Sequence, residues 1–152
     1  MIQFNRILFP VSLTNISPKL VPYVETMATK HEAEIHLLHV AHEFNQYVDT
    51  YITQKSETDF LKLASNFEKE FLTMANNRLT EFKDKYFKEH PKVRISAISG
   101  QHYKEILNYI DKENIDLVIM GTGRGLHKAI FGSVTDKVAK LAKVPVMLIQ
   151  TA

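Results

Sequence analysis

Cysteine is absent from the 152-residue sequence. This excludes disulfides, thiolate nucleophiles and Cys-ligated zinc, and it is typical of a domain that folds in a reducing compartment. Long apolar runs are also missing, because the longest have four to five residues, whereas a membrane span needs about 20. The first residues lack the apolar core of a signal peptide. We therefore expect a cytoplasmic protein that does not bind a membrane.

An excess of charge of one sign is missing as well. The 19 Lys and Arg residues nearly balance the 17 Asp and Glu residues, for a net charge of +2. A nucleic-acid surface needs clustered basic residues, so we expect no nucleic-acid partner. The length is close to the commonest domain size, which predicts a single domain over residues 1–152.

The common catalytic signatures do not occur in the sequence. It contains neither the G-x4-G-K-[ST] string of a P-loop nor the G-x-S-x-G string of a nucleophile elbow. The first predicted strand has no carboxylate at its end for the metal of a receiver domain. His36, His39 and His42 form the densest histidine set, but a spacing of three on a strand puts neighbours on opposite faces, which favours structural roles over a shared metal. We expect no dedicated catalytic activity.

The hydrophobic pattern alternates between strands and helices. Short apolar or alternating runs predict strands at residues 7–11, 34–40, 93–99, 116–120 and 145–149. Apolar residues at helical spacing predict a helix that ends near His31, with Ser17 as its cap and Pro18 as its first residue. Further helices are predicted at 56–87, around 103–110 and at 133–142. Strands alternating with helices predict an α/β fold, a doubly wound five-stranded parallel sheet with helices on both faces.

The predicted helix at 56–87 is longer than the sheet that it must cover. At about 1.5 Å per residue it exceeds about 40 Å, so we expect it to project beyond the sheet or to kink near Asn76 and Asn77. Its apolar stripe is more typical of core than of a partner surface, although Tyr47, Tyr51 and this stripe remain candidates for a partner surface. The members of the stripe are Phe60, Leu63, Ala64, Phe67, Phe71, Met74 and Phe82.

Glycine is scarce, but four of the five glycines follow the fourth predicted strand, between residues 121 and 132. In parallel sheets, ligands bind where the strand order reverses, which makes the loops after the first and fourth strands the places to inspect. Glycines and the start of the helix at Ser133 would offer backbone N–H groups to a phosphate. Arg124, His127 and Lys128 add cations to this loop. Alternatively, the glycines only permit a tight loop, and Ser133 forms a capping box with Asp136.

These segments resemble the universal stress protein family, of the UspA-like type, across nearly the whole chain. The resemblance is carried by R-I-L-F-P-V at 6–11, A-E-I-H-L-L-H-V at 33–40, D-L-V-I-M-G-T-G-R-G at 116–125, G-S-V at 132–134 and V-P-V-M-L-I at 144–149. It implies a Rossmann-like fold of the adenine nucleotide alpha hydrolase type. It also implies a site for ATP or another adenine nucleotide, with Mg²⁺ present only together with the nucleotide.

The resemblance places the nucleotide on two loops and on their neighbours. ATP-binding members carry G-x2-G-x9-G-S/T after the fourth strand, whereas this chain has G-x1-G-x8-G-S and so a loop about two residues shorter. Those members also close the first strand with P-V-D, where this chain has Ser12 in place of the aspartate. The residues implied in nucleotide binding are Pro10, Val11, Ser12, Val40, Met120, Gly121, Gly123, Arg124, Gly132, Ser133 and Val134.

Three functions follow as hypotheses. The first is a stress-response regulatory or protective module that binds ATP or a related nucleotide. The second is a dimeric interaction module without a nucleotide, which Ser12 and the short loop favour. The third is a weak nucleotide hydrolase. The last strand, residues 145–149, is apolar and is expected at an edge of the sheet, where it needs cover from a helix or from another chain. The resemblance implies the second, a homodimer that pairs through this strand.

Overall fold

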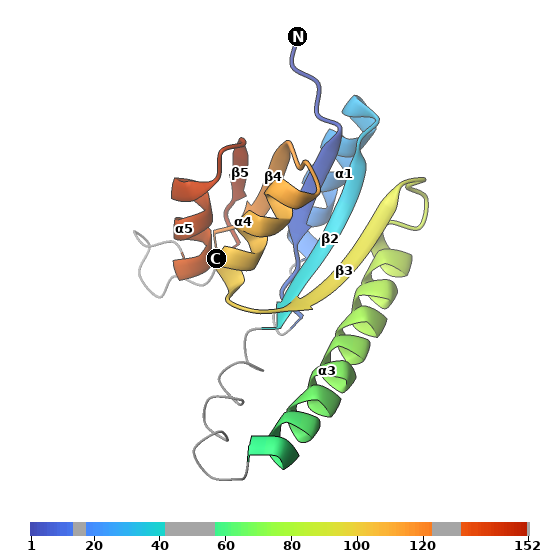
Figure 1. Cartoon of the computed structure of the whole chain (residues 1–152). Helices are drawn as coiled ribbons and strands as arrows, with labels where there is room; N and C mark the ends of the chain where they lie inside the picture. The colour runs from blue at the N-terminus through green and yellow to red at the C-terminus, as the bar shows by residue number, and fades with distance from the viewer. Residues whose placement is uncertain (14–17, 42–56, 123–131, 152) are drawn as a thin grey trace.

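The computed structural model of the chain describes residues 1–13, 18–41, 57–122 and 132–151. Within them, strands and helices alternate along the chain (Figure 1). The elements are β1 (Arg6–Pro10), the 3-10 turn η1 (Pro18–Leu20), α1 (Val21–His31), β2 (Glu34–Ala41), α3 (Glu57–Tyr86), β3 (Val93–Ser99), α4 (His102–Lys112), β4 (Leu117–Gly121), α5 (Ser133–Leu141) and β5 (Val146–Ile149).

The five strands form one parallel sheet in the order β3-β2-β1-β4-β5. Helices α1 and α3 cover one face, and α4 and α5 cover the other, as predicted for a doubly wound sheet (Figure 1). Each face has its own hydrophobic core. The central strands β1 and β4 supply both, because successive side chains of a strand point to opposite faces: Ile7 and Phe9 pack with α1 and α3, whereas Leu8 packs with α4.

Helix α1 begins later than predicted. Pro18 opens the 3-10 turn, and α1 starts at Val21 and ends at His31. The physical reason is Pro22, which has no N–H to donate to the carbonyl of residue 18, so that an α-helix starting at Pro18 would lack this hydrogen bond in its first turn. Pro22 is instead accommodated in the first turn. The predicted cap, Ser17, lies outside the described residues.

Helix α3 is one continuous helix of 30 residues that passes through Asn76 and Asn77. It lies along β3, and its N-terminal part extends past the carboxyl ends of the strands (Figure 1). The helix therefore projects, as one of the two alternatives predicted. No helix among the described residues is both long and apolar enough to cross a bilayer.

The apolar stripe of α3 does not lie in the core as expected. Of its members with described side chains, only Phe82 is buried, whereas four are exposed by 40–62%: Leu63, Phe67, Phe71 and Met74. The buried residues of the helix are Ala75, Leu79 and Phe82. The expectation was wrong because, among the described side chains, the helix packs into the core only from Ala75 onward.

Candidate functional site

The strand order reverses between β1 and β4, as the predicted position of the site requires. These strands are paired at Ile7–Leu117 and Leu8–Val118, whereas β1 and β2 stay paired as far as Pro10. Among the described residues, the pairing of β1 with β4 ends at Leu8–Val118, and Pro10 has no N–H with which to continue it. Such a switch point is where open α/β sheets bind ligands.

The end of β1 is held by its neighbours. Pro10 is the last residue of the strand and is half-buried. Val11 is buried, its N–H donates to the carbonyl of Leu38 at 2.7 Å, and its carbonyl lies 2.9 Å from Nδ1 of His39. Ser12 follows and is exposed. Ser12 therefore stands at the carboxyl edge of the sheet, where the family pattern has its aspartate.

Two more side chains hold this edge. His102, the first residue of α4, places Nε2 3.0 Å from the carbonyl of Val40, which is buried near the end of β2. Arg78 of α3 donates from Nη2 to the carbonyl of Leu13 at 2.8 Å. Sequence analysis gave His39 a structural role without a partner, and it missed His102 and Arg78. These side chains contact backbone carbonyls, and only the tertiary structure says which carbonyl a side chain reaches.

The end of β4 is close-packed around Gly121. A Cβ atom at this position would lie 2.7 Å from Cγ2 of Thr151, so the strand accepts only glycine without a rearrangement. The Gly121 carbonyl accepts a hydrogen bond of 3.0 Å from Oγ1 of Thr135 in α5. The N–H of Gly132 donates to the Thr122 carbonyl at 2.9 Å. The end of β4 and the start of α5 are thus fixed side by side.

The predicted capping box is wrong. Gly132 is the N-cap of α5, and Ser133 is the first helical residue. Asp136 forms an ion pair with Lys140 at 3.0 Å instead of reaching back to the helix start. No side chain among the described residues caps α5. The uncapped start of a helix is a place where an anion can bind.

The remaining predicted residues fall into two groups. Gly123 and Arg124 lie outside the described residues, as do His127 and Lys128. Val40 and Met120 are buried in the core beneath α4 and α5, and the partly buried Val134 packs against the same core. The structure thus gives these three apolar residues a packing role, and it brings Val11, Ser12, Gly121, Gly132 and Ser133 to the carboxyl edge of the sheet.

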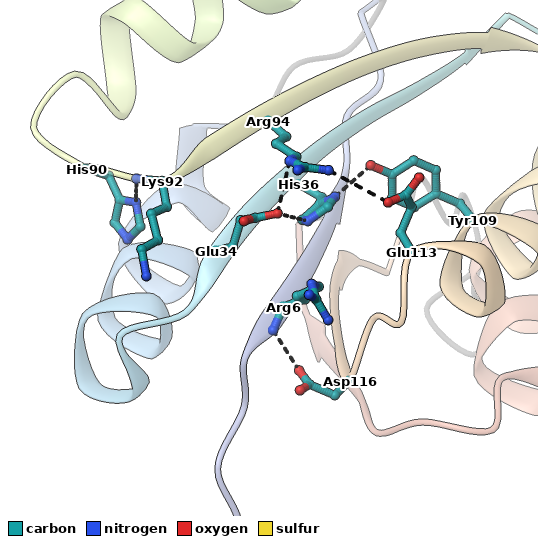
Figure 2. Close-up of polar contacts among 9 residues, drawn as sticks. All are labelled: Arg6, Glu34, His36, His90, Lys92, Arg94, Tyr109, Glu113 and Asp116. Atoms are coloured by element: carbon teal, nitrogen blue, oxygen red, sulfur yellow. Dashed lines mark hydrogen bonds and ion pairs between the residues drawn. The ribbon is translucent and has the colours of Figure 1, made fainter.

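A second polar cluster lies between the sheet and α4 (Figure 2). His36 of β2 is fully buried, with Nδ1 2.6 Å from the Tyr109 hydroxyl and Nε2 2.6 Å from Oε1 of Glu34. Arg94 of β3 contacts Glu34 at 3.2 Å and Glu113 at 3.8 Å. Sequence analysis assigned His36 only a structural role and did not find its partners, of which Tyr109 lies 73 positions away.

Burial dominates the titration of this cluster. It lowers the pKa of His36 below 6.5, although the Glu34 carboxylate acts in the opposite direction. Burial also raises the pKa of Tyr109 to about 12. Both groups are therefore neutral near pH 7. Among the described residues, no set of three or more His, Asp or Glu side chains is arranged to hold a metal ion.

Comparison with known proteins agrees with the fold. The model of the "Universal stress protein family" matches residues 3–150. The universal stress protein YxiE of Bacillus subtilis is 24% identical over 97% of this chain and its own full length. Universal stress protein MJ0577 of Methanocaldococcus jannaschii is 25% identical over 98% of this chain and 96% of its own.

Solved structures show the same architecture. The structure of MJ0577 superposes with a TM-score of 0.79 at 22% identity and covers 99% of both chains. A universal stress protein crystallised in complex with cAMP has a TM-score of 0.59 at 15% identity and also covers 99% of both chains. At these identities the structures establish the fold, and the family match over nearly the whole chain establishes the membership. This chain belongs to the universal stress protein family.

Proposed function

We propose that this chain is a stress-response regulatory or protective module that binds ATP or another adenine nucleotide at the carboxyl ends of β1 and β4. The observation that carries the proposal is the reversal of strand order between β1 and β4 beside the start of α5, where no side-chain cap is found among the described residues. A helix start without a side-chain cap presents N–H donors and partial positive charge to a phosphate. Gly132 holds this start next to Thr122 at the end of β4.

The base would lie toward β1 and β2. Ser12 supplies a hydroxyl that can donate or accept a hydrogen bond, and the backbone around Val11 and Val40 is held by His39 and His102. A ligand that meets such a held backbone loses less conformational entropy on binding than one that must order it. The relative crystallised with cAMP supports an adenine ligand in this fold.

Catalysis is not part of the proposal. Near the start of α5 the described acid is Asp136, which is paired with Lys140. This ion pair gives Asp136 a structural role on the helix surface. Asp136 is a poor general base because its carboxylate already has a cationic partner. Mg²⁺ would enter with the nucleotide phosphates and not by itself.

The test is to identify small molecules released from the purified protein by mass spectrometry, followed by calorimetric titration with ATP and GTP. We expect an adenine nucleotide to co-purify or ATP to bind more tightly than GTP. A protein that releases no nucleotide and binds neither ATP nor cAMP at millimolar concentration would instead be the dimeric interaction module. Steady release of phosphate from ATP would favour the weak hydrolase.

A further inference from the structure

The cluster around His36 lies outside the candidate nucleotide site. His36 and Glu34 belong to the first half of β2, and Tyr109 and Glu113 belong to the last turn of α4 and the residue that follows it. The candidate nucleotide site is at the opposite end of the strands. Helix α4 joins the two regions, because His102 at its start contacts the carbonyl of Val40.

The contacts form a chain from helix to sheet (Figure 2). The Tyr109 hydroxyl is 2.6 Å from Nδ1 of His36, and Nε2 of the same ring is 2.6 Å from Oε1 of Glu34. The two rings also meet edge to face, with centroids 5.6 Å apart. The exposed fraction of His36 is 0%, so its ring cannot take up a proton directly from solvent.

Every element packed against His36 contributes to its electrostatic environment. Glu34 lies on the same strand, Arg94 on β3, and Tyr109 and Glu113 on α4. From β1, the register partner of His36 is the apolar Leu8, and that of Glu34 is Arg6. The backbone N–H of Arg6 donates to Asp116. Thus the Glu34 carboxylate contacts the ring directly, the Arg94 guanidinium pairs with Glu34, and the Glu113 carboxylate pairs with Arg94.

The neutral ring satisfies this chain with a single arrangement of protons. Tyr109 keeps its proton, since its pKa is about 12. Its O–H donates a hydrogen bond to Nδ1 of His36. The ring proton then lies on Nε2 and faces the Glu34 carboxylate, because the opposite tautomer would turn a lone pair toward a negative charge. Nε2 lacks a hydrogen bond of good geometry despite its short distance to Oε1. Through this short contact and through its charge, Glu34 raises the pKa of His36 against the effect of burial.

Protonation of His36 breaks this arrangement at the tyrosine. Both ring nitrogens become donors, so that Nδ1–H and the Tyr109 O–H oppose each other across 2.6 Å. The hydroxyl must turn its proton away and find another acceptor, and a positive charge must be held in the core. Burial is the largest influence on the pKa of His36 and opposes that charge.

We propose that Glu34, His36 and Tyr109 form a proton-operated latch, which holds the C-terminal part of α4 on β2 while His36 is neutral and loosens it when the ring takes up a proton. The unfolded chain has the ordinary histidine pKa of about 6.5, and the folded pKa is lower. The folded state therefore binds fewer protons than the unfolded state in this interval. The stabilisation is complete above about pH 6.5 and is lost as the pH falls through the folded pKa.

The test combines two NMR measurements on the wild-type protein between about pH 7.5 and pH 4.5. Ring ¹⁵N shifts report the protonation state of His36, and amide hydrogen exchange reports the opening of α4. We expect a neutral ring at the upper pH with its proton on Nε2. On acidification we expect protection factors at Ile106, Tyr109 and Ile110 to fall by about tenfold or more, while Leu8 and Val118 in the central strands keep theirs.

Variants separate the latch from general acid destabilisation. His36→Gln has an amide that does not titrate, so we expect protection of α4 to lose its pH dependence. Tyr109→Phe keeps the ring but removes the hydroxyl, and it is expected to show at about pH 7.5 the low protection of α4 that wild type shows in acid. His90→Gln is the matched control, because His90 is another histidine with a lowered pKa but lies in the loop before β3. It should keep the wild-type response.

Wild-type measurements alone can overturn the proposal, even if His36→Gln does not fold. The latch is wrong if His36 is already charged at about pH 7.5, or if protection of α4 does not fall by about pH 4.5. It is also wrong if α4 and the central strands lose protection together, because that result describes global unfolding. None of these outcomes depends on nucleotide binding.

Discussion

Ser12 and Gly132 stand at the two sides of the candidate nucleotide site. Ser12 is exposed after β1, and Gly132 is the N-cap of α5. The φ of Gly132 is −54°, a value that any residue can adopt. A substitution at Gly132 consequently changes the chemistry of the helix start without backbone strain at this residue.

Gly132→Asp is expected to weaken ATP binding while the fold is kept or slightly stabilised. Aspartate is a favourable N-cap and would accept hydrogen bonds from the same N–H groups that are proposed to meet phosphate. We expect the affinity for ATP to fall by about tenfold or more, from competition and charge repulsion together. Calorimetry gives the affinity and thermal unfolding gives the stability.

Gly132→Asn is the matched control, because asparagine caps a helix equally well without a negative charge. It should raise stability similarly and cost less affinity than aspartate. Equal ATP affinity in wild type and Gly132→Asp would remove the start of α5 from the proposed site.

Ser12→Asp is expected to strengthen ATP binding, since the family pattern places an aspartate at the base. A hydrogen bond to a charged group contributes about 1.5–3 kcal/mol, so we expect a gain of at least about tenfold for ATP and little change for GTP. Calorimetric titrations of both nucleotides check this, with Ser12→Asn as the uncharged control. An equal gain for both nucleotides, or a loss for ATP, would show that Ser12 does not contact the base.

At the scale of the secondary-structure element, α3 presents two different apolar surfaces. Phe82 is buried and packs edge to face on Phe9, with ring centroids 6.0 Å apart. Phe67 of the same helix is 49% exposed. The same residue type on one helix thus has two environments, which allows a matched comparison.

Phe82→Ala is expected to lower the free energy of unfolding by about 3–5 kcal/mol, because it removes a large buried side chain and leaves a cavity. Phe67→Ala should cost less than about 1 kcal/mol if solvent already reaches the ring, as for most surface substitutions. Urea denaturation measures both. A large loss of unfolding free energy for Phe67→Ala would mean that a partner or another part of the chain covers this ring.

At the scale of the whole molecule, β5 is an edge of the sheet and pairs with β4 on one side. The carbonyls of Pro145 and Ile149 accept hydrogen bonds from Val118 and Thr122 of the β4 segment. Since backbone groups of alternate residues point to opposite sides of a strand, the N–H groups of Val146 and Leu148 point to the open side. The edge is therefore able to pair with the edge of a second copy.

We propose that the protein forms a homodimer through β5, which light scattering at micromolar concentration measures directly. Leu148→Pro removes one outward N–H without removing a β4 hydrogen bond, and it should produce a monomer. Leu148→Ala loses the same side chain but keeps the N–H, so it should remain a dimer. A monomeric mass for the wild-type protein would refute the dimer.

Much of the fold could be predicted from local pattern. Buried runs such as L-V-I-M at 117–120 identified the strands to within a residue at each end, and their alternation with helices predicted the doubly wound order, which the structure confirms. These predictions succeeded because period and turn chemistry are local properties of a chain. The predicted start of α1 at Pro18 was wrong, because Pro22 cannot donate a hydrogen bond within the first turn of such a helix.

The sequence by itself determined the α/β class, the family and the absence of cysteine chemistry. Only the tertiary structure decided that the stripe from Leu63 to Met74 is exposed, that Asp136 pairs with Lys140, and that His36 meets Tyr109. The reason is physical: a helical or strand period says which residues share a face. Whether another element covers that face, and which distant polar group lies opposite, depends on how elements far apart in the chain pack together.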